Sequence, residues 1–160
     1  DLVGAGYSPK ELCEADCPAA EVLDPQRAPE RDVAALYKAG FSARKLVAAG
    51  ATVQELRGAG VPDKVIQELD LPMSELVSQY AVSTLAGWGY ALGDLVNYFQ
   101  VSDLVAAKCY SWAELHAVPS NRDTSAKALV AEGAKLRDLK EAGVAPMELR
   151  DAGFTAAEIS

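Results

Sequence analysis

The sequence predicts an all-α fold, a solenoid-like stack of short helices with about ten residues in each helix-turn unit. One observation is that a leucine-type residue followed by an Ala-Gly pair returns every ten residues along most of the 160-residue chain. A second is that signals for helix starts alternate with these glycines, which are typical of helix ends. Each unit is expected to contact mainly its neighbours.

The helix starts are marked by capping boxes, in which a Ser or Thr stands three residues before a Glu. The hydroxyl accepts a backbone N–H, and the glutamate accepts the N–H of the capping residue. We expect a helix to begin directly after each Ser or Thr. The boxes are Ser8-x-x-Glu11, Thr52-x-x-Glu55, Ser111-x-x-Glu114 and Thr155-x-x-Glu158.

The helix ends are marked by glycines, where a left-handed residue costs little. An apolar residue follows each of them, as the Schellman motif prefers. Helices of about two turns are unstable alone, since isolated helices below about 12 residues are marginal in water. They therefore have to pack together. The glycines are Gly40, Gly50, Gly60, Gly143 and Gly153.

The predicted core contains the leucine-type anchor, the alanine three residues later and the apolar residue after the glycine. The charged residues Glu11, Lys38, Arg57, Lys140 and Asp151 are expected to face water. The anchors are Leu2, Leu12, Val22, Leu36, Leu46, Leu56, Ile66, Leu76, Leu95, Val105, Leu115, Leu129, Leu139, Leu149 and Ile159.

The organisation predicted from this spacing is a single α-helical repeat array over residues 1–160. The anchor spacing lengthens from ten to 14 residues at two places, which predicts insert loops near 23–32 and 117–125. An irregular, aromatic-rich segment covers residues 79–112. Neither end shows a polar capping unit, so we expect the chain to be a fragment or processed part of a longer one.

The composition disfavours several classes of function. The chain has 15 Lys and Arg against 23 Asp and Glu, and a net charge of −8 repels nucleic acids and anionic membranes. The single histidine, His116, excludes multi-histidine metal sites. The uncharged stretch 76–93 is too polar for a transmembrane segment. We therefore expect no catalytic residue, no metal and no cofactor.

The three cysteines are too few for a disulfide framework. Cys13 and Cys17 could share a metal or a disulfide, but no second pair completes a zinc site. Cys17 occupies the apolar position after a turn, which favours a small buried side chain. Cys109 occupies the glycine position of its unit.

Aromatic residues gather where the repeat pattern weakens. One interpretation is a protein-docking face, because Trp and Tyr dominate interface hot spots. The other is that large side chains fill gaps left where the small residues of the repeat are missing. The candidate protein-interaction residues are Tyr80, Trp88, Tyr90, Tyr98, Phe99 and Trp112.

Two phrases, Ala-Gly-Phe-Ser at 39–42 and Ala-Gly-Phe-Thr at 152–155, occur with Glu-Leu or Glu-Ile steps. In these phrases the chain resembles the tandem Ala-Gly-Phe-Ser-x-x-Glu-Leu decapeptide arrays of large algal and protist proteins. The resemblance implies a scaffold of short-helix repeats.

The predicted function is a non-enzymatic structural scaffold or linker subunit that mediates protein–protein interactions within a larger assembly. One alternative is a nucleic-acid-binding module, because Leu-x-x-Ala-Gly-Phe-Ser loosely resembles the turn of helix-hairpin-helix modules; the acidic charge argues against it. Another alternative is a small enzyme with an aromatic-lined pocket. The expected partners are other proteins, with no nucleic acid.

Overall fold

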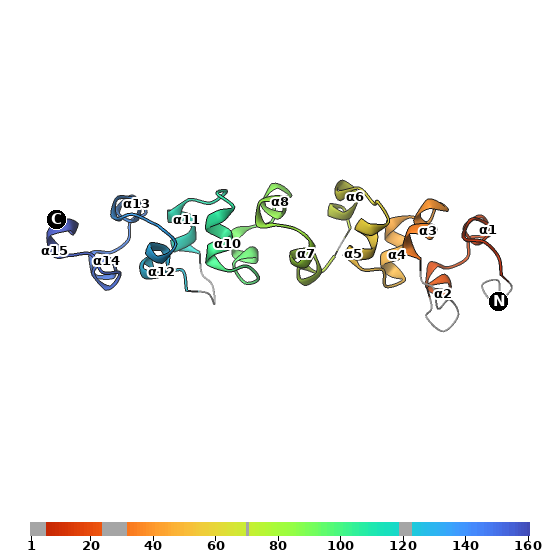
Figure 1. Cartoon of the computed structure of the whole chain (residues 1–160), viewed down its shortest axis with the longest axis horizontal. Helices are drawn as coiled ribbons and strands as arrows, with labels where there is room; N and C mark the ends of the chain where they lie inside the picture. The colour runs from red at the N-terminus through yellow and green to blue at the C-terminus, as the bar shows by residue number, and fades with distance from the viewer. Residues whose placement is uncertain (1–5, 24–31, 70, 119–122) are drawn as a thin grey trace. The chain divides into compact units, whose positions relative to one another are not determined.

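The computed structural model describes residues 6–23, 32–69, 71–118 and 123–160, and these residues form fifteen short helices and no strand (Figure 1). The helices contain four to seven residues each. The predicted all-α class is confirmed. Leu2, most of the first predicted insert loop (23–32) and residues 119–122 of the second (117–125) lie outside the described residues.

The chain divides into two compact units, Asp1–Gln79 and Tyr80–Ser160. The first contains α1 (Pro9–Glu14), α2 (Ala19–Val22), α3 (Val33–Lys38), α4 (Ala43–Ala48), α5 (Val53–Gly58), α6 (Asp63–Gln67) and α7 (Met73–Gln79). The second contains α8 (Val82–Gly87), α9 (Leu92–Leu95), α10 (Val101–Ala106), α11 (Trp112–Ala117), α12 (Ala126–Ala131), α13 (Leu136–Glu141), α14 (Pro146–Asp151) and α15 (Ala156–Ile159). The single array over residues 1–160 stays a prediction.

All four predicted capping boxes begin a helix, at α1, α5, α11 and α15. At α5 the backbone N–H of Thr52 donates to Glu55 Oε2 over 2.7 Å, and the N–H of Glu55 donates back to Thr52 Oγ1 over 3.3 Å. The local sequence therefore decides where these helices start, because each box satisfies N–H groups that a helix leaves without partners.

Three capping glutamates predict an acid-sensitive fold. Hydrogen bonds from the hydroxyl and backbone of Ser8, Ser111 and Thr155 hold the pKa values of Glu11, Glu114 and Glu158 below the ordinary 4.5. A carboxyl whose folded pKa is depressed stabilises the fold above its unfolded pKa, and this contribution disappears as the pH falls through the folded pKa. The urea midpoint should therefore fall as the pH drops below 4.5.

The matched variant is Glu114→Gln, which keeps the size of the side chain but cannot ionise. It should have a lower urea midpoint at neutral pH and a weaker dependence on pH between neutrality and the acid range. A pH dependence equal to that of the unchanged chain would contradict the assignment to this capping box.

The predicted helix ends are also confirmed. Gly40, Gly50, Gly60, Gly143 and Gly153 all have positive φ angles. After α3 the N–H of Phe41 donates to the Leu36 carbonyl and the N–H of Gly40 to the Tyr37 carbonyl, both over 3.1 Å. These are the two hydrogen bonds of the Schellman motif, and they turn the chain toward the next helix.

Two of the short helix-turn repeats make the same turn without glycine. Asp16 and Lys108 have φ angles of 50° and 56°, and each stands four residues after a fully buried leucine, Leu12 or Leu104. The assignment of Cys109 to the glycine position was therefore wrong by one residue. The left-handed residue is Lys108, because this unit is one residue shorter before its turn.

The core consists of the predicted leucine-type anchors, with two corrections. Val105 is half-buried, whereas its neighbour Leu104 is fully buried and replaces it as the anchor. Leu85, for which the periodicity predicts no anchor, fills the interval between Leu76 and Leu95 and is fully buried. Ile159 is half-buried. The fully buried leucine-type anchors are Leu46, Leu56, Ile66, Leu76, Leu85, Leu95, Leu104, Leu115, Leu129, Leu139 and Leu149.

The other predicted core positions agree in part. Several of the residues after the turns are buried, among them Phe41, Val61 and Val144, whereas Phe154 is half-buried. The alanines three residues after the anchors are mostly half-buried, and only Ala59 is buried. They cap the helix ends, so one side of each remains near solvent. The five charged residues predicted to face water are exposed.

Helices pack most closely against the second helix along the chain. The closely packed alternate pairs are α1 with α3, α3 with α5, α5 with α7, α2 with α4, α11 with α13, and α12 with α14. Consecutive helices contact one another less. All of the close pairs thus join helices that are one or two steps apart along the chain.

Glutamates reinforce this alternate packing in both units. Glu75 at the third position of α7 accepts the N–H of Val53, the first residue of α5, over 3.3 Å. Glu148 at the third position of α14 accepts the N–H of Ala126, the first residue of α12, over 3.1 Å. A helix thus receives a cap from the second helix after it along the chain.

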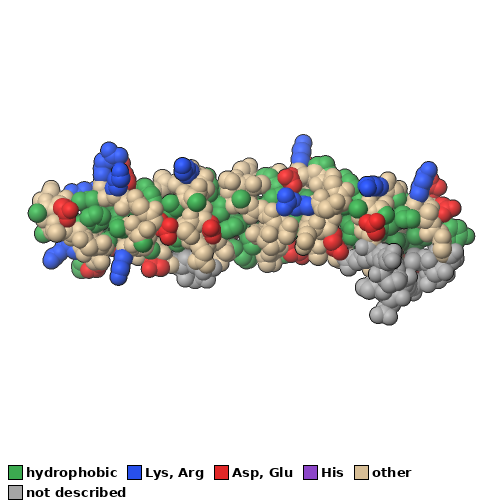
Figure 2. Space-filling model, viewed as in Figure 1, with side chains coloured by type: hydrophobic (Ala, Val, Ile, Leu, Met, Phe, Trp, Pro, Cys, Tyr) green, Lys and Arg blue, Asp and Glu red, His purple; other side chains and the backbone are tan. Residues whose placement is uncertain are grey.

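Charged side chains project from the face shown in Figure 2, and hydrophobic side chains lie lower between them. Within the described residues, no helix has the length and apolarity needed to cross a membrane. The uncharged stretch 76–93 instead falls into parts of α7, α8 and α9 with turns between them.

Candidate protein-interaction site

Tyr80 and Trp88 form a pair at the two ends of α8. Their ring centroids lie 4.6 Å apart, with the planes tilted by 58°. Tyr80 is buried and Trp88, which caps the end of α8, is half-buried. This pair fills space in the second unit, as the gap-filling interpretation expects of large side chains.

Tyr90 and Tyr98 occupy turns. Tyr90 follows Gly89 and donates its N–H to the Leu85 carbonyl over 3.2 Å, so it takes the post-glycine position of the repeat and is half-buried. Tyr98, which follows α9, is 46% exposed. Tyr98 is therefore the candidate aromatic most available to a partner.

Trp112 is the first residue of α11 and lines a small pocket of about 210 Å³ with Tyr110 and Lys108. The Tyr110 hydroxyl is buried and makes no hydrogen bond to the described part of the chain. Burial raises the pKa of this phenol, and the nearby Cys109 and Glu114 act in the same direction. The tyrosine therefore stays protonated.

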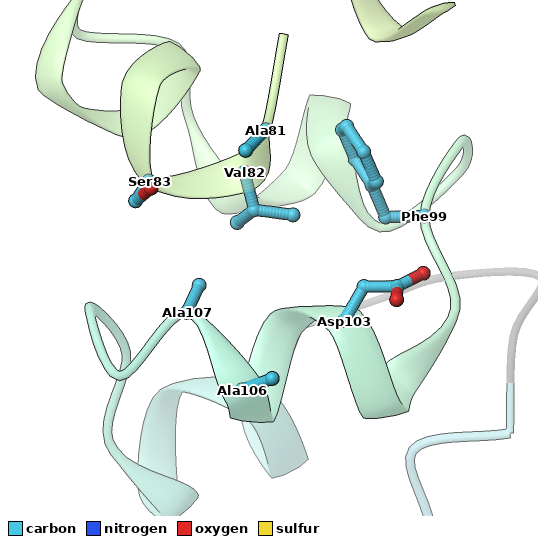
Figure 3. A pocket seen from close by; sticks show the side chains of 7 residues that line it. All are labelled: Ala81, Val82, Ser83, Phe99, Asp103, Ala106 and Ala107. Atoms are coloured by element: carbon cyan, nitrogen blue, oxygen red, sulfur yellow. The ribbon is translucent and has the colours of Figure 1, made fainter.

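An apolar groove of about 430 Å³ lies between α8 and α10 (Figure 3). We call it the α8–α10 groove. Val82 points from α8 toward Ala106 of α10 and Ala107, which caps the end of α10, and Phe99 and Asp103 lie at one end of the groove. The groove residues are Ala81, Val82, Ser83, Phe99, Asp103, Ala106 and Ala107.

The groove exists because α8 and α10 are not among the closely packed alternate pairs. Small side chains at Ala81, Ala106 and Ala107 leave the space between the two helices open. The exposed Asp103 accepts the N–H of Gln100 over 3.2 Å and adds a negative charge at the edge. The groove can thus accept an apolar side chain that has a cationic group beside it.

Among the six predicted aromatics, only Phe99 lines the α8–α10 groove, while Tyr80 and Trp88 pair with each other. The sequence pattern did not predict a role for Val82, Asp103 or the three alanines. The small residues at 81, 106 and 107 occur where the repeat pattern weakens, and this combination could have indicated an open space between helices.

His116 joins three elements of the second unit. Its Nδ1 lies 3.4 Å from the Thr124 carbonyl oxygen and its Nε2 lies 3.5 Å from Glu148 Oε2. Since Glu148 also caps α12, these contacts connect α11, α12 and α14. The geometry gives His116 a role in packing.

All three cysteines are free thiols. Cys17 is buried, as predicted, Cys13 is half-buried and Cys109 is exposed. The described residues contain no group of three or more His, Cys, Asp or Glu side chains placed to hold a metal ion.

Comparisons of the chain with protein-family models, with curated proteins and with solved structures find no match.

Proposed function

We propose that the chain is a non-enzymatic scaffold or linker subunit that binds other proteins within a larger assembly. The observation that carries this proposal is the α8–α10 groove, an apolar recess between two helices that are not among the closely packed pairs. Apolar grooves between helices are a common docking place for a partner's side chains.

The lining of the groove defines the partner's chemistry. Val82, Phe99 and the alanines favour an apolar side chain, while the carboxylate of Asp103 favours a Lys or Arg next to it. The net charge of −8 attracts basic segments over a longer range. The proposed partner is therefore a polypeptide that presents an apolar residue next to a basic one.

The same proposal includes a solenoid-like arrangement of the helices. Two features support it. Alternate helices pack against each other inside each compact unit, and Glu75 and Glu148 each cap the second helix before their own. The resemblance to tandem Ala-Gly-Phe-Ser decapeptide arrays supports it as well. Such arrays offer extended surfaces built from repeated short elements.

The test compares three forms of the chain, used as bait in an extract of the source cells. Ala106→Arg fills the groove and adds a positive charge that opposes the carboxylate of Asp103. Ala113→Arg makes the same change at an exposed position of α11 outside the groove. We expect the unchanged chain and Ala113→Arg to retain the same partner proteins. The amount of these proteins that Ala106→Arg retains should be lower by about tenfold or more.

Circular dichroism should show equal helicity for all three forms, so that loss of binding is separated from loss of fold. A photo-crosslinker at the groove residue Ser83 should then capture a peptide with a Lys or Arg beside an apolar residue. Equal retention by the three forms would contradict the proposal. A salt-dependent shift of DNA would instead favour the nucleic-acid alternative.

A further inference from the structure

We propose that Cys13 and Cys17 form a dithiol site that reacts with small-molecule disulfides and closes to an intramolecular disulfide. Both side chains line one pocket of about 160 Å³ at the end of α1. The pocket lies within the first unit, far along the chain from the α8–α10 groove, and the proposal does not depend on the proposed function.

The Schellman turn after α1 places the two cysteines at the same pocket. The N–H of Asp16 donates to the Cys13 carbonyl over 3.0 Å, and the N–H of Cys17 donates to the Leu12 carbonyl over 2.9 Å. These bonds fold residue 17 back onto the last turn of the helix. The backbone therefore brings both cysteines to the wall of the same pocket before any reaction.

The two thiols differ in access. Cys13 is half-buried, whereas Cys17 is 6% exposed. A disulfide in solution therefore meets Cys13 first. Cys17 needs no contact with solvent, because its target is a sulfur that is already inside the pocket.

Lys45 supplies a positive charge at this site. Its ammonium lies 2.7 Å from Asp16 Oδ1, and it lines the same pocket as Cys13. Lys45 neutralises the carboxylate of Asp16, which lines the same pocket and would otherwise repel an anionic disulfide such as oxidised glutathione. Lys45 is accordingly a positioning residue, which acts through the charge that the incoming disulfide meets.

The reaction proceeds in two exchanges. The Cys13 thiolate attacks one sulfur of the small disulfide RS–SR; the S–S bond breaks, one RS⁻ leaves and takes up a proton, and Cys13–S–SR remains. The Cys17 thiolate then attacks the Cys13 sulfur and expels the second RS⁻. Overall, two protein thiols are oxidised to one disulfide, and the small disulfide is reduced to two thiols.

The surroundings of Cys13 favour the second exchange. A Cβ added at Gly40 would stand 3.4 Å from Cys13 Sγ, so the sulfur lies against the turn that ends α3. A glutathione group is larger than a pocket of about 160 Å³ accommodates together with its lining side chains. The mixed disulfide is therefore crowded, and closure to the compact Cys13–Cys17 disulfide relieves the crowding.

The first experiment uses oxidised glutathione without oxygen on the full chain carrying Cys109→Ser, which removes the exposed third thiol. Intact mass should fall by the mass of two hydrogen atoms, without an accumulating glutathione adduct. Adding Cys17→Ser should leave one glutathione on Cys13, and adding Cys13→Ser should prevent the reaction of Cys17. An adduct that persists when both cysteines are present, or an unreacted pair, would overturn the proposal.

The second experiment tests Lys45 by the rate of the first exchange in the Cys109→Ser chain. Lys45→Ala should slow it about threefold or more, whereas Lys45→Arg, which keeps the charge, should leave it nearly unchanged. Circular dichroism before reaction verifies that the variants are folded. An unchanged rate in Lys45→Ala would remove the positioning role from the proposal.

Discussion

Replacing Leu139 with alanine is expected to lower the free energy of unfolding by about 3 kcal/mol, within the range of about 2–5 kcal/mol for buried leucines. Leu139 is the anchor of α13 and is fully buried. Truncation removes apolar contact and leaves a cavity that a helix of six residues cannot refill by shifting without breaking its own turns. Urea denaturation followed by circular dichroism measures the change.

The matched control lies in the same helix. Leu136 is the first residue of α13 and is half-buried, so Leu136→Ala should cost about 1 kcal/mol, since less apolar area returns to water. Equal losses for the two variants would mean that the ten-residue anchor position has no special place in the core.

Replacing Gly40 with alanine is expected to cost about 2 kcal/mol. Its φ of 109° lies in the left-handed region, where a side chain is strained by about 1–2 kcal/mol. The added Cβ would also come into ordinary van der Waals contact with Cys13 Sγ at 3.4 Å, so backbone strain accounts for most of the loss. The same urea titration measures the loss.

Two other glycines separate these causes. Gly60 has a φ of 80° and open space around it, so Gly60→Ala should show the backbone strain without the contact. Gly58 is the last residue of α5, has no positive φ and faces open space, so Gly58→Ala should stabilise the chain by up to about 1 kcal/mol. A stabilising Gly40→Ala would refute the left-handed turn at this position.

The helix boundaries could be predicted from the sequence because they depend on local chemistry. A hydroxyl with a glutamate three residues later, as at Thr52 and Glu55, satisfies N–H groups within one turn. A glycine such as Gly40 ends the helix through bonds to residues three to five positions before it. Neither device needs a distant partner.

The shifted anchors could not be predicted with the same rule. Leu104 replaced Val105 because its unit turns at Lys108, a residue that rarely adopts a left-handed conformation. Packing of the buried leucine outweighs this local cost. A ten-residue period without allowance for nine- or eleven-residue steps therefore misplaces such a unit.

The candidate site depended on packing between helices that lie apart in the sequence. The aromatic content predicted a docking role for Trp88 and Trp112. The α8–α10 groove is instead formed mainly by small side chains and Val82. Whether small residues leave a space depends on how closely two helices approach. That distance is not encoded at any single position.

The cap that Glu148 places on α12 has a consequence for how such a chain can gain or lose length. Val53 and Met73, the first residues of α5 and α7, stand twenty positions apart, as do Ala126 and Pro146. Deleting the decapeptide between the two partners would leave Glu75 or Glu148 about ten residues closer to the helix start that it caps, and the hydrogen bond would lose its geometry. Duplicating or deleting a decapeptide outside these pairs leaves both caps in place.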